Sequence, residues 1–224
     1  MTAAPSSARR RPSGATATRA RLLAAALHVF AERGFRRGTM RAICRRAGVN
    51  GASANYHFRS KGRLYRAVLR DAFARLQREA PFPDATTAPR TQAEARARLR
   101  SVVEGIASSL LAPRAAPHAL LALREMTEPT AALDDIVDDA IRPRFEAICA
   151  AVRGLRPGAS DLEVRFAALS VVGQVVYHRT AGPVALRLLG EKAYGPPLVR
   201  AVVDHVVAFS ERALLPGAAR DGGR

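Results

Sequence analysis

Apolar residues recur every three or four positions along most of this chain, which is the spacing of one face of an α-helix. We find no strand-period alternation, no hairpin signal and no internal repeat. We therefore predict an all-α fold, with Gly34 as a natural helix stop and Pro143 forcing a kink or break in its helix. The predicted helices cover residues 18–33, 39–47, 50–58, 61–79, 92–111, 117–126, 131–153, 161–179, 183–190 and 197–214.

Residues 39–61 carry the clearest functional signal. Two short helices, with Thr39 and Asn50 as predicted N-caps, meet across a turn at Gly48, where glycine enters left-handed backbone space without steric cost. Apolar residues four apart in each helix face inward. The side chains left facing outward are those of Arg41, Arg45, Arg46, Asn50, Ser53, Asn55 and Tyr56. Two helices packed across a glycine turn, with such a surface, predict a helix-turn-helix that binds DNA.

The helices predicted at 161–179 and 197–214 are apolar on two sides. In the first, one stripe runs from Leu162 through Phe166 and Leu169, and a second runs from Val164 through Ala168. A helix that is apolar on two sides must be covered on two sides. We expect the second cover to be another copy of the chain, giving a four-helix interface about a two-fold axis.

Turn-forming residues and these helices divide the chain into regions. Three prolines in 80–91 indicate a linker, and Pro5, Pro12 and the triplet Arg9-Arg10-Arg11 indicate a flexible arm. That arm is either a solvated tail or a further contact to DNA. We predict a disordered basic arm at 1–17, a helix-turn-helix DNA-binding domain with its connecting helix at 18–79, a linker at 80–91, a helical ligand-binding and dimerisation domain at 92–215 and a disordered tail at 216–224.

The net charge of +17 is concentrated at the front of the chain. Residues 1–70 hold 16 Lys and Arg and one acid, Glu32, whereas the other 154 residues hold 20 basic and 18 acidic side chains. This split is expected of a polyanion-binding module attached to a separate domain. The acid-free start also looks like a mitochondrial transit peptide, but its apolar positions are needed for the first helix.

Cysteine usage and hydropathy exclude several classes of protein. Cys44 and Cys149 form no CxxC pair, so we expect neither a disulfide framework nor a four-ligand zinc site, and no cofactor. The cysteine usage also favours an intracellular, reducing compartment, so we expect a cytoplasmic location. No apolar run approaches 18 residues, so we expect no membrane span.

The N-terminal region carries a combination of residues that is typical of a known family. These residues are Leu22, Ala26, Phe30, Gly34-Phe35, Thr39, Ile43, Ala47-Gly48-Val49, His57-Phe58, Ser60-Lys61 and Leu64. With it, residues 18–68 closely resemble the DNA-binding domain of TetR-type transcriptional regulators. Residues 122–148 and 168–190 are similar to the C-terminal domain of the CecR (YbiH) branch of that family. The resemblance implies an all-helical homodimer whose larger domain binds a small molecule and whose small domains bind a palindromic operator.

The chain departs from the usual family pattern at three positions. The family usually has Tyr at the position of Asn55, Ala at that of Cys44, and Glu or Asp at that of Gly62. We therefore do not transfer the operator sequences of relatives to this chain.

The chemistry of each residue sets its expected role on DNA. Thr39 and Lys61 open helices and can reach phosphates, and Tyr56 and His57 resemble the family's phosphate-contacting pair, although His57 could instead be a packing residue. The small side chains at 51–53 let their helix enter the groove deeply. Asn55 can pair bidentately with adenine. The predicted DNA contacts are Thr39, Arg41, Asn50, Gly51, Ala52, Ser53, Asn55, Tyr56, His57 and Lys61.

In the larger domain we expect a small-molecule pocket between helices, walled by apolar side chains with a few polar groups. The candidate residues are Arg124, Met126, Phe145, Phe166, Gln174, Tyr177 and His178. Ordinary packing is the alternative for each of them, and Arg124 could equally form a structural ion pair with Glu125 or Glu128.

Together these features predict a ligand-responsive transcriptional regulator, a homodimeric repressor that a small molecule releases from a palindromic DNA operator. A sequence-independent nucleic-acid-binding protein would explain the charge, but not the small-residue helix or the two-faced helices. A helical enzyme with a basic surface is the other alternative, although neither metal spacing nor a nucleophile-base pairing is found in the sequence.

Overall fold

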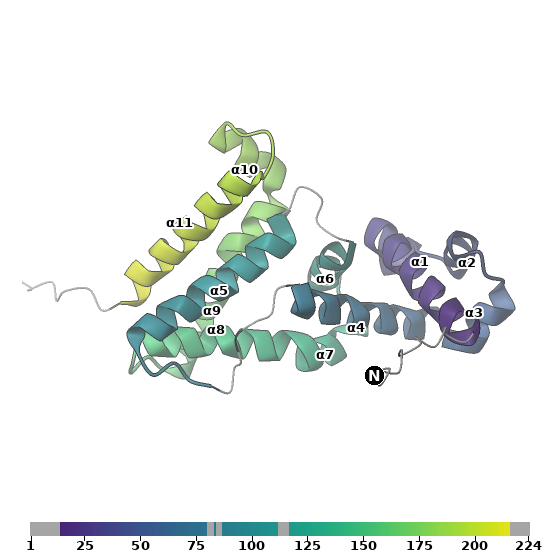
Figure 1. Cartoon of the computed structure of the whole chain (residues 1–224), viewed down its shortest axis with the longest axis horizontal. Coiled ribbons are helices and arrows are strands. Elements are labelled where there is room, and N and C mark those ends of the chain that lie inside the picture. The colour runs from purple at the N-terminus through teal and green to yellow at the C-terminus, as the bar shows by residue number, and fades with distance from the viewer. Residues whose placement is uncertain (1–13, 80–82, 84–86, 112–116, 216–224) are drawn as a thin grey trace, which may run out of the picture. The chain divides into compact units, whose positions relative to one another are not determined.

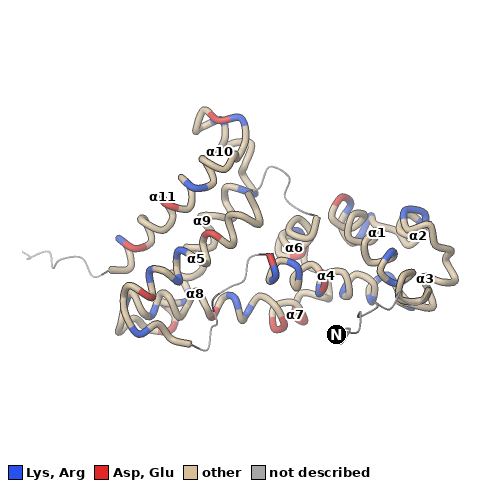
Figure 2. Tube along the Cα trace, in the orientation of Figure 1, with Lys and Arg blue, Asp and Glu red and all other residues tan. Residues whose placement is uncertain are grey.

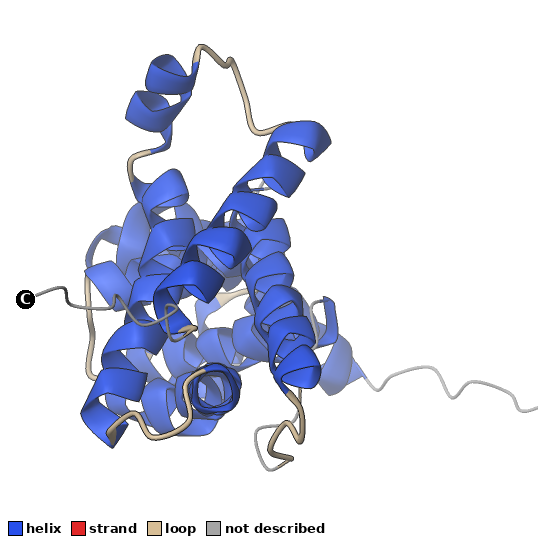
Figure 3. Cartoon of the chain, turned by 90° about the vertical axis from the view of Figure 1, so that its left-hand side faces the viewer, coloured by secondary structure: helices blue, strands red, loops and turns tan. Residues whose placement is uncertain are grey.

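The chain folds into helices joined by short connections, and the structure, a computed structural model, contains no strand in the residues that it describes (Figure 3). The predicted all-α fold is confirmed. Two compact units divide the chain between Val68 and Leu69. Of the predicted regions, most of the arm, six residues of the linker and the tail lie outside the described residues. The described residues are 14–79, 83, 87–111 and 117–215.

The helices follow the predicted ranges closely (Figure 1). In chain order they are α1 (Gly14–Arg37), α2 (Met40–Ala47), α3 (Gly51–Phe58), α4 (Lys61–Glu79), α5 (Gln92–Leu111), α6 (Pro117–Thr127), α7 (Leu133–Ile136), the π-helical turn η1 (Val137–Ile141), α8 (Arg142–Leu155), α9 (Asp161–Thr180), α10 (Gly182–Leu189) and α11 (Pro196–Leu214).

α1 is longer than the pattern predicted. Residues 14–17, which we assigned to the arm, form its first turn, where the Thr18 hydroxyl donates to the Gly14 carbonyl over 2.9 Å. At the other end, Gly34 leaves helical geometry (φ 72°, ψ 174°), and a further turn extends to Arg37. The predicted stop at Gly34 is therefore a kink, which a residue without Cβ accepts at positive φ.

Pro143 widens its helix instead of breaking it. A proline ring clashes with the carbonyl four residues earlier, here that of Asp139, if the α-helix continues. Val137–Ile141 form a π-helical turn immediately before this position, and α8 then continues to Leu155. The wider turn removes the clash, so the segment from α7 to α8 stays helical throughout.

Unit 1 packs α1, α2, α3 and the start of α4 around an apolar core. Ile43 and Ala54, one from each short helix, are fully buried, as are Leu22 and Phe30 of α1. The ring of Phe30 meets that of Tyr65 edge-on, with centroids 4.9 Å apart. The inward faces predicted for the two short helices are thus the faces that hold them on α1 and on each other.

In unit 2, α5 packs against α8, α9 and α11 (Figure 1). The Val164 stripe of α9 faces this core, since Val164, Ala168 and Val175 are fully buried. The Arg100 guanidinium of α5 donates to Asp204 of α11 over 2.7 Å at the edge of the packing. None of the described helices is long and apolar enough to cross a membrane.

Candidate DNA interface

The turn between α2 and α3 is held from both sides. The Thr39 hydroxyl accepts a hydrogen bond from the Ala42 amide at the start of α2, and Gly48 ends the helix in the left-handed region (φ 60°). Arg21 of α1 donates to the carbonyl oxygens of Ala47 (2.6 and 3.0 Å) and Gly48 (2.6 Å). These carbonyls would otherwise lack helical partners. Arg21 therefore anchors the turn on the first helix.

α3 presents one face to its own unit and the other to solvent. The Asn50 side chain caps the helix by accepting from the Ser53 amide over 2.7 Å. Ala54 and Phe58 are buried, while Gly51, Ala52, Asn55 and Tyr56 are exposed. Tyr56 is 81% exposed, which is unusual for so large a ring and leaves its hydroxyl available to an external partner. The outward face predicted for the second helix is therefore accessible.

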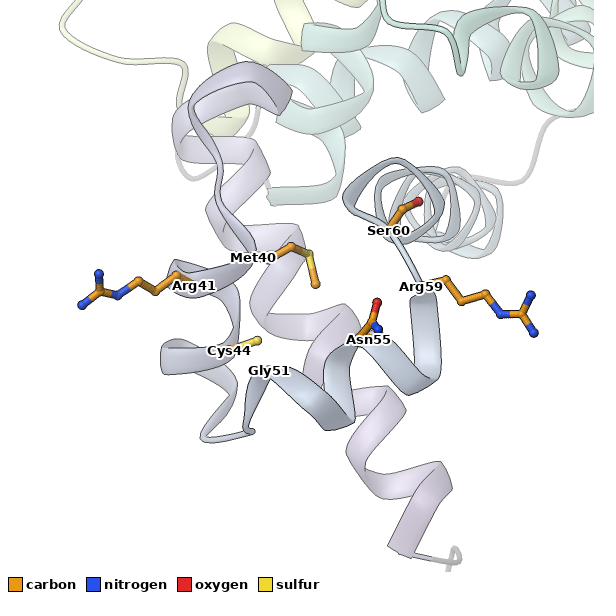
Figure 4. Close-up of a pocket in the computed structure, with 7 residues that line it drawn as sticks. All are labelled: Met40, Arg41, Cys44, Gly51, Asn55, Arg59 and Ser60. Carbon is orange, nitrogen blue, oxygen red and sulfur yellow. The ribbon is translucent and has the colours of Figure 1, made fainter.

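A hollow of about 430 Å³ separates the outer edges of α2 and α3 (Figure 4). Its lining residues are Met40, Arg41, Cys44, Gly51, Asn55, Arg59 and Ser60. The Asn55 amide lies at this hollow in Figure 4, whereas the side chains of Arg41 and Arg59 extend away from it on opposite sides. The structure thus gathers Arg41, Gly51 and Asn55 of the predicted set around one concave surface.

Thr39, Tyr56 and His57 lie outside the hollow's lining. Thr39 is exposed at the N-terminus of α2. His57 is half-buried, with its ring centroid 5.3 Å from that of Tyr56. A half-buried His57 can act as a packing residue, which was the alternative from the sequence, and can also contact an external partner.

The Lys61 side chain contacts two other residues of unit 1. Its ammonium nitrogen lies 4.4 Å from the centroid of the Phe35 ring and 3.5 Å from the Arg36 carbonyl oxygen. The Lys61 side chain, which we predict to contact a phosphate, therefore also links the start of α4 to the end of α1.

Positive charge dominates the described part of unit 1 (Figure 2). Glu32 is its one acidic residue, and it lies 3.8 Å from Arg46 in an exposed ion pair. Arg41 and Arg45 have no ion-pair partner among the described residues. A surface with this surplus attracts polyanions at long range, with an attraction that falls as salt rises.

Our sequence reasoning missed four residues that line the hollow, namely Met40, Cys44, Arg59 and Ser60. Met40 and Cys44, one helical turn apart, both line the hollow, and that spacing was visible in the sequence. Arg59 adopts a positive φ (58°), the only non-glycine residue to do so in the described chain, and no sequence signal indicated this. The anchoring role of Arg21 depends on residues 26 and 27 positions away, which a local pattern does not reveal.

The seven predicted pocket residues of unit 2 have different surroundings. Arg124 forms the ion pair with Glu128 (3.2 Å) that we considered as its alternative role. Phe145 is half-buried in the core, and Met126, Phe166 and Tyr177 are exposed. Gln174 donates to Ser210 of α11 over 3.4 Å. His178 lines a cavity at the ends of α5 and α9.

The two cysteines are both buried and unbonded. Burial raises the pKa of the Cys149 thiol, which keeps it protonated and unreactive. The described residues include no group of three or more His, Cys, Asp or Glu side chains that could hold a metal ion.

Two family models match this chain. Residues 22–68 match the bacterial regulatory proteins of the tetR family, and residues 95–214 match the C-terminal domain of the HTH-type transcriptional dual regulator CecR. This chain is a member of the TetR family. Its C-terminal domain is CecR-like, and one match lies in each unit. A comparison with curated proteins finds no match.

Solved structures share the fold along nearly the whole chain. A TetR-like transcriptional regulator from Rhodococcus sp. RHA1 is 22% identical, with a TM-score of 0.61 over 91% of this chain and 98% of its own. A transcriptional regulator from Saccharomonospora viridis, solved with choline, is 22% identical, with a TM-score of 0.57 over 88% and 97%. AibR, solved with isovaleryl coenzyme A and operator DNA, is 15% identical, with a TM-score of 0.64 over 86% and 97%. At these identities the likeness establishes the fold.

Proposed function

We propose that this TetR-family regulator is a homodimeric repressor that binds a palindromic operator and releases it when a small molecule binds the larger unit. The outward face of α3 is the observation that carries the proposal. Gly51 and Ala52 are exposed there, Asn55 follows one turn later, and the helix belongs to a unit with a single acid. Small side chains admit a helix to the major groove, and an exposed amide beside them can read a base edge.

The other side of α9 supports the dimer. Leu162, Phe166 and Leu169 are all more than half exposed, although Val164 and Ala168 on the same helix are fully buried. Phe209 of α11 is also 56% exposed. Large apolar side chains exposed on two helices of one unit are costly in water and fit burial against a second copy. Two copies related by a two-fold axis would present two α3 helices to two matching half-sites.

The effector part of the proposal is supported by the larger unit and by related structures. Structures of the fold have been solved with choline and with isovaleryl coenzyme A, so small molecules of different chemistry bind proteins with this architecture. A ligand that binds the operator-free arrangement better than the operator-bound one lowers operator affinity by that difference in affinity.

Binding to operator and random duplexes separates this proposal from sequence-independent binding. A duplex selected in vitro and a scrambled duplex of equal length are compared by fluorescence anisotropy at physiological salt. We expect the operator to bind at least about a thousandfold more tightly, as specific regulators do. Equal affinities would favour the sequence-independent binder. Operator affinity that no small molecule or condition alters would remove the effector part alone.

Asn55→Ala tests base readout. We expect a loss of roughly 1–3 kcal/mol on the operator, because a bidentate amide–adenine pair contributes about that much discrimination. The substitution should also relax sequence preference at one position of each half-site. Affinities across an operator library randomised position by position measure both effects. Relative affinities that match those of the native protein would show that Asn55 reads no base.

Lys61→Ala tests a phosphate contact. We expect weaker binding to all sequences alike and a salt dependence of log affinity that is flatter by about one unit, since one released counterion is lost. Removal of the contact with the Phe35 ring should also cost about 0.5–1 kcal/mol of stability at this partly exposed site. Salt titrations and urea unfolding measure the two effects separately. A loss confined to particular sequences would contradict the phosphate role.

A further inference from the structure

A cavity of about 220 Å³ lies in unit 2 where α5, α9 and α10 end or begin. Leu110 and Leu111 of α5 and Leu186 of α10 form apolar walls, and the segment that joins α10 to α11 contributes Lys192 and Tyr194. The volume lies below the roughly 300–1,000 Å³ of pockets that hold drug-sized ligands. A ligand of this cavity must therefore be small.

The polar groups of the cavity are cationic. Arg179 and Lys192 line it, and no Asp or Glu does so. Neither cation has an ion-pair partner among the described residues, whereas Arg100, Arg124, Arg142, Arg153, Arg156 and Arg165 of the same unit each have one. Two uncompensated cations beside an apolar wall attract a ligand that carries an anionic group on an apolar body.

The remaining polar groups are neutral and oriented. His178 Nδ1 lies 2.9 Å from the Tyr194 hydroxyl, and Tyr194 is itself buried. Burial and the nearby His205 lower the pKa of His178, and burial raises the pKa of Tyr194. At neutral pH the pair is an uncharged imidazole hydrogen-bonded to a phenol. Such groups add hydrogen-bonding capacity without adding charge, so the two cations set the charge of the site.

We propose that this cavity binds the effector, and that the effector is a small molecule with a carboxylate or phosphate head held by Arg179 and Lys192 and a short apolar body against Leu110, Leu111 and Leu186. The assignment of this cavity to an effector rests on the proposed function, whereas anion binding by the cavity does not.

Isothermal titration calorimetry with hexanoate, hexyl phosphate and hexylamine, at matched ionic strength, tests the site on the full chain. We expect saturable binding of at least one anion and none of the amine, with the two anions showing which head group is preferred. Arg179→Gln and Lys192→Gln should each weaken anion binding roughly tenfold or more, as expected for loss of a hydrogen bond to a charged group. Arg96→Gln, on an exposed face of α5 outside the cavity, should leave it unchanged.

Failure of the site and failure of the proposed function give different results. Absence of anion binding, or binding that both cavity variants leave unchanged, would overturn the site. Anion binding that both variants weaken, with operator affinity unaffected by the bound anion, would keep the binding site and overturn its effector role. Release of the operator by another compound, equally in native and variant proteins, would keep the effector response and place it elsewhere. The thermal unfolding midpoints of the variants should match that of the native protein.

Discussion

Ala52→Glu is expected to weaken operator binding by about a hundredfold or more, since a like charge placed against a binding partner costs several kcal/mol. Ala52 is exposed in the first turn of α3, so the new carboxylate would meet the phosphates of any duplex that this helix enters. The fold should tolerate it, because an acidic side chain near a helix N-terminus is stabilising. Fluorescence anisotropy with the operator and thermal unfolding measure the two effects.

Two companion variants separate the causes. Ala52→Gln has nearly the same size without the charge, so the difference between the two variants reports repulsion by the phosphates. Ala74→Glu adds the same charge at an exposed position on α4 and should leave operator affinity within a few-fold of the native value. If Ala52→Glu bound the operator as tightly as the native protein, α3 would not be the helix that enters the groove.

The double substitution Phe166→Glu with Leu169→Glu is expected to convert the dimer to monomers. Phe166 is 61% and Leu169 56% exposed on one face of α9, so the isolated unit should accept both changes. In the proposed interface the two carboxylates would be buried without partners, which costs several kcal/mol each. A monomer holds one half-site only, so apparent operator affinity should fall by roughly a hundredfold or more.

Light scattering after size-exclusion chromatography gives the mass, and anisotropy gives the affinity. Met126→Glu is the matched control, because Met126 is a 49% exposed apolar residue on α6, away from α9 and α11. It should remain dimeric and bind the operator normally. A double variant that stays dimeric would show that this face of α9 is not the interface.

Local pattern predicted most helix limits because the signals that determine them lie within a few residues. Thr39 and Asn50 cap their helices through the amides three positions on, and Gly48 takes the left-handed conformation that the turn required. Pro143 did perturb its helix, but the relief by a wider turn depends on how the whole segment packs. The early start of α1 was missed because glycine and threonine propensities argue against a helix at 14–17.

Contacts between distant segments could not be predicted from the sequence. The two stripes of α9 looked equally apolar, and only the structure shows that the Val164 stripe, made of small and β-branched residues, is the one that packs on the core. Phe166 and Tyr177, chosen as pocket candidates, lie among the exposed residues of α9. The cavity at His178 also draws on Arg179 and Lys192, whose meeting depends on the path of the chain from α10 to α11.

The central proposal is that the chain binds DNA as a dimer and with sequence specificity. In vitro selection from a random duplex library, with the full chain at physiological salt, tests it most directly. We predict enrichment of a nearly palindromic motif with two half-sites at a fixed spacing, and loss of the paired motif when the Phe166→Glu and Leu169→Glu double variant is used for selection. A library that remains unenriched, or a single unpaired half-site selected by the native chain, would contradict dimeric, sequence-specific binding.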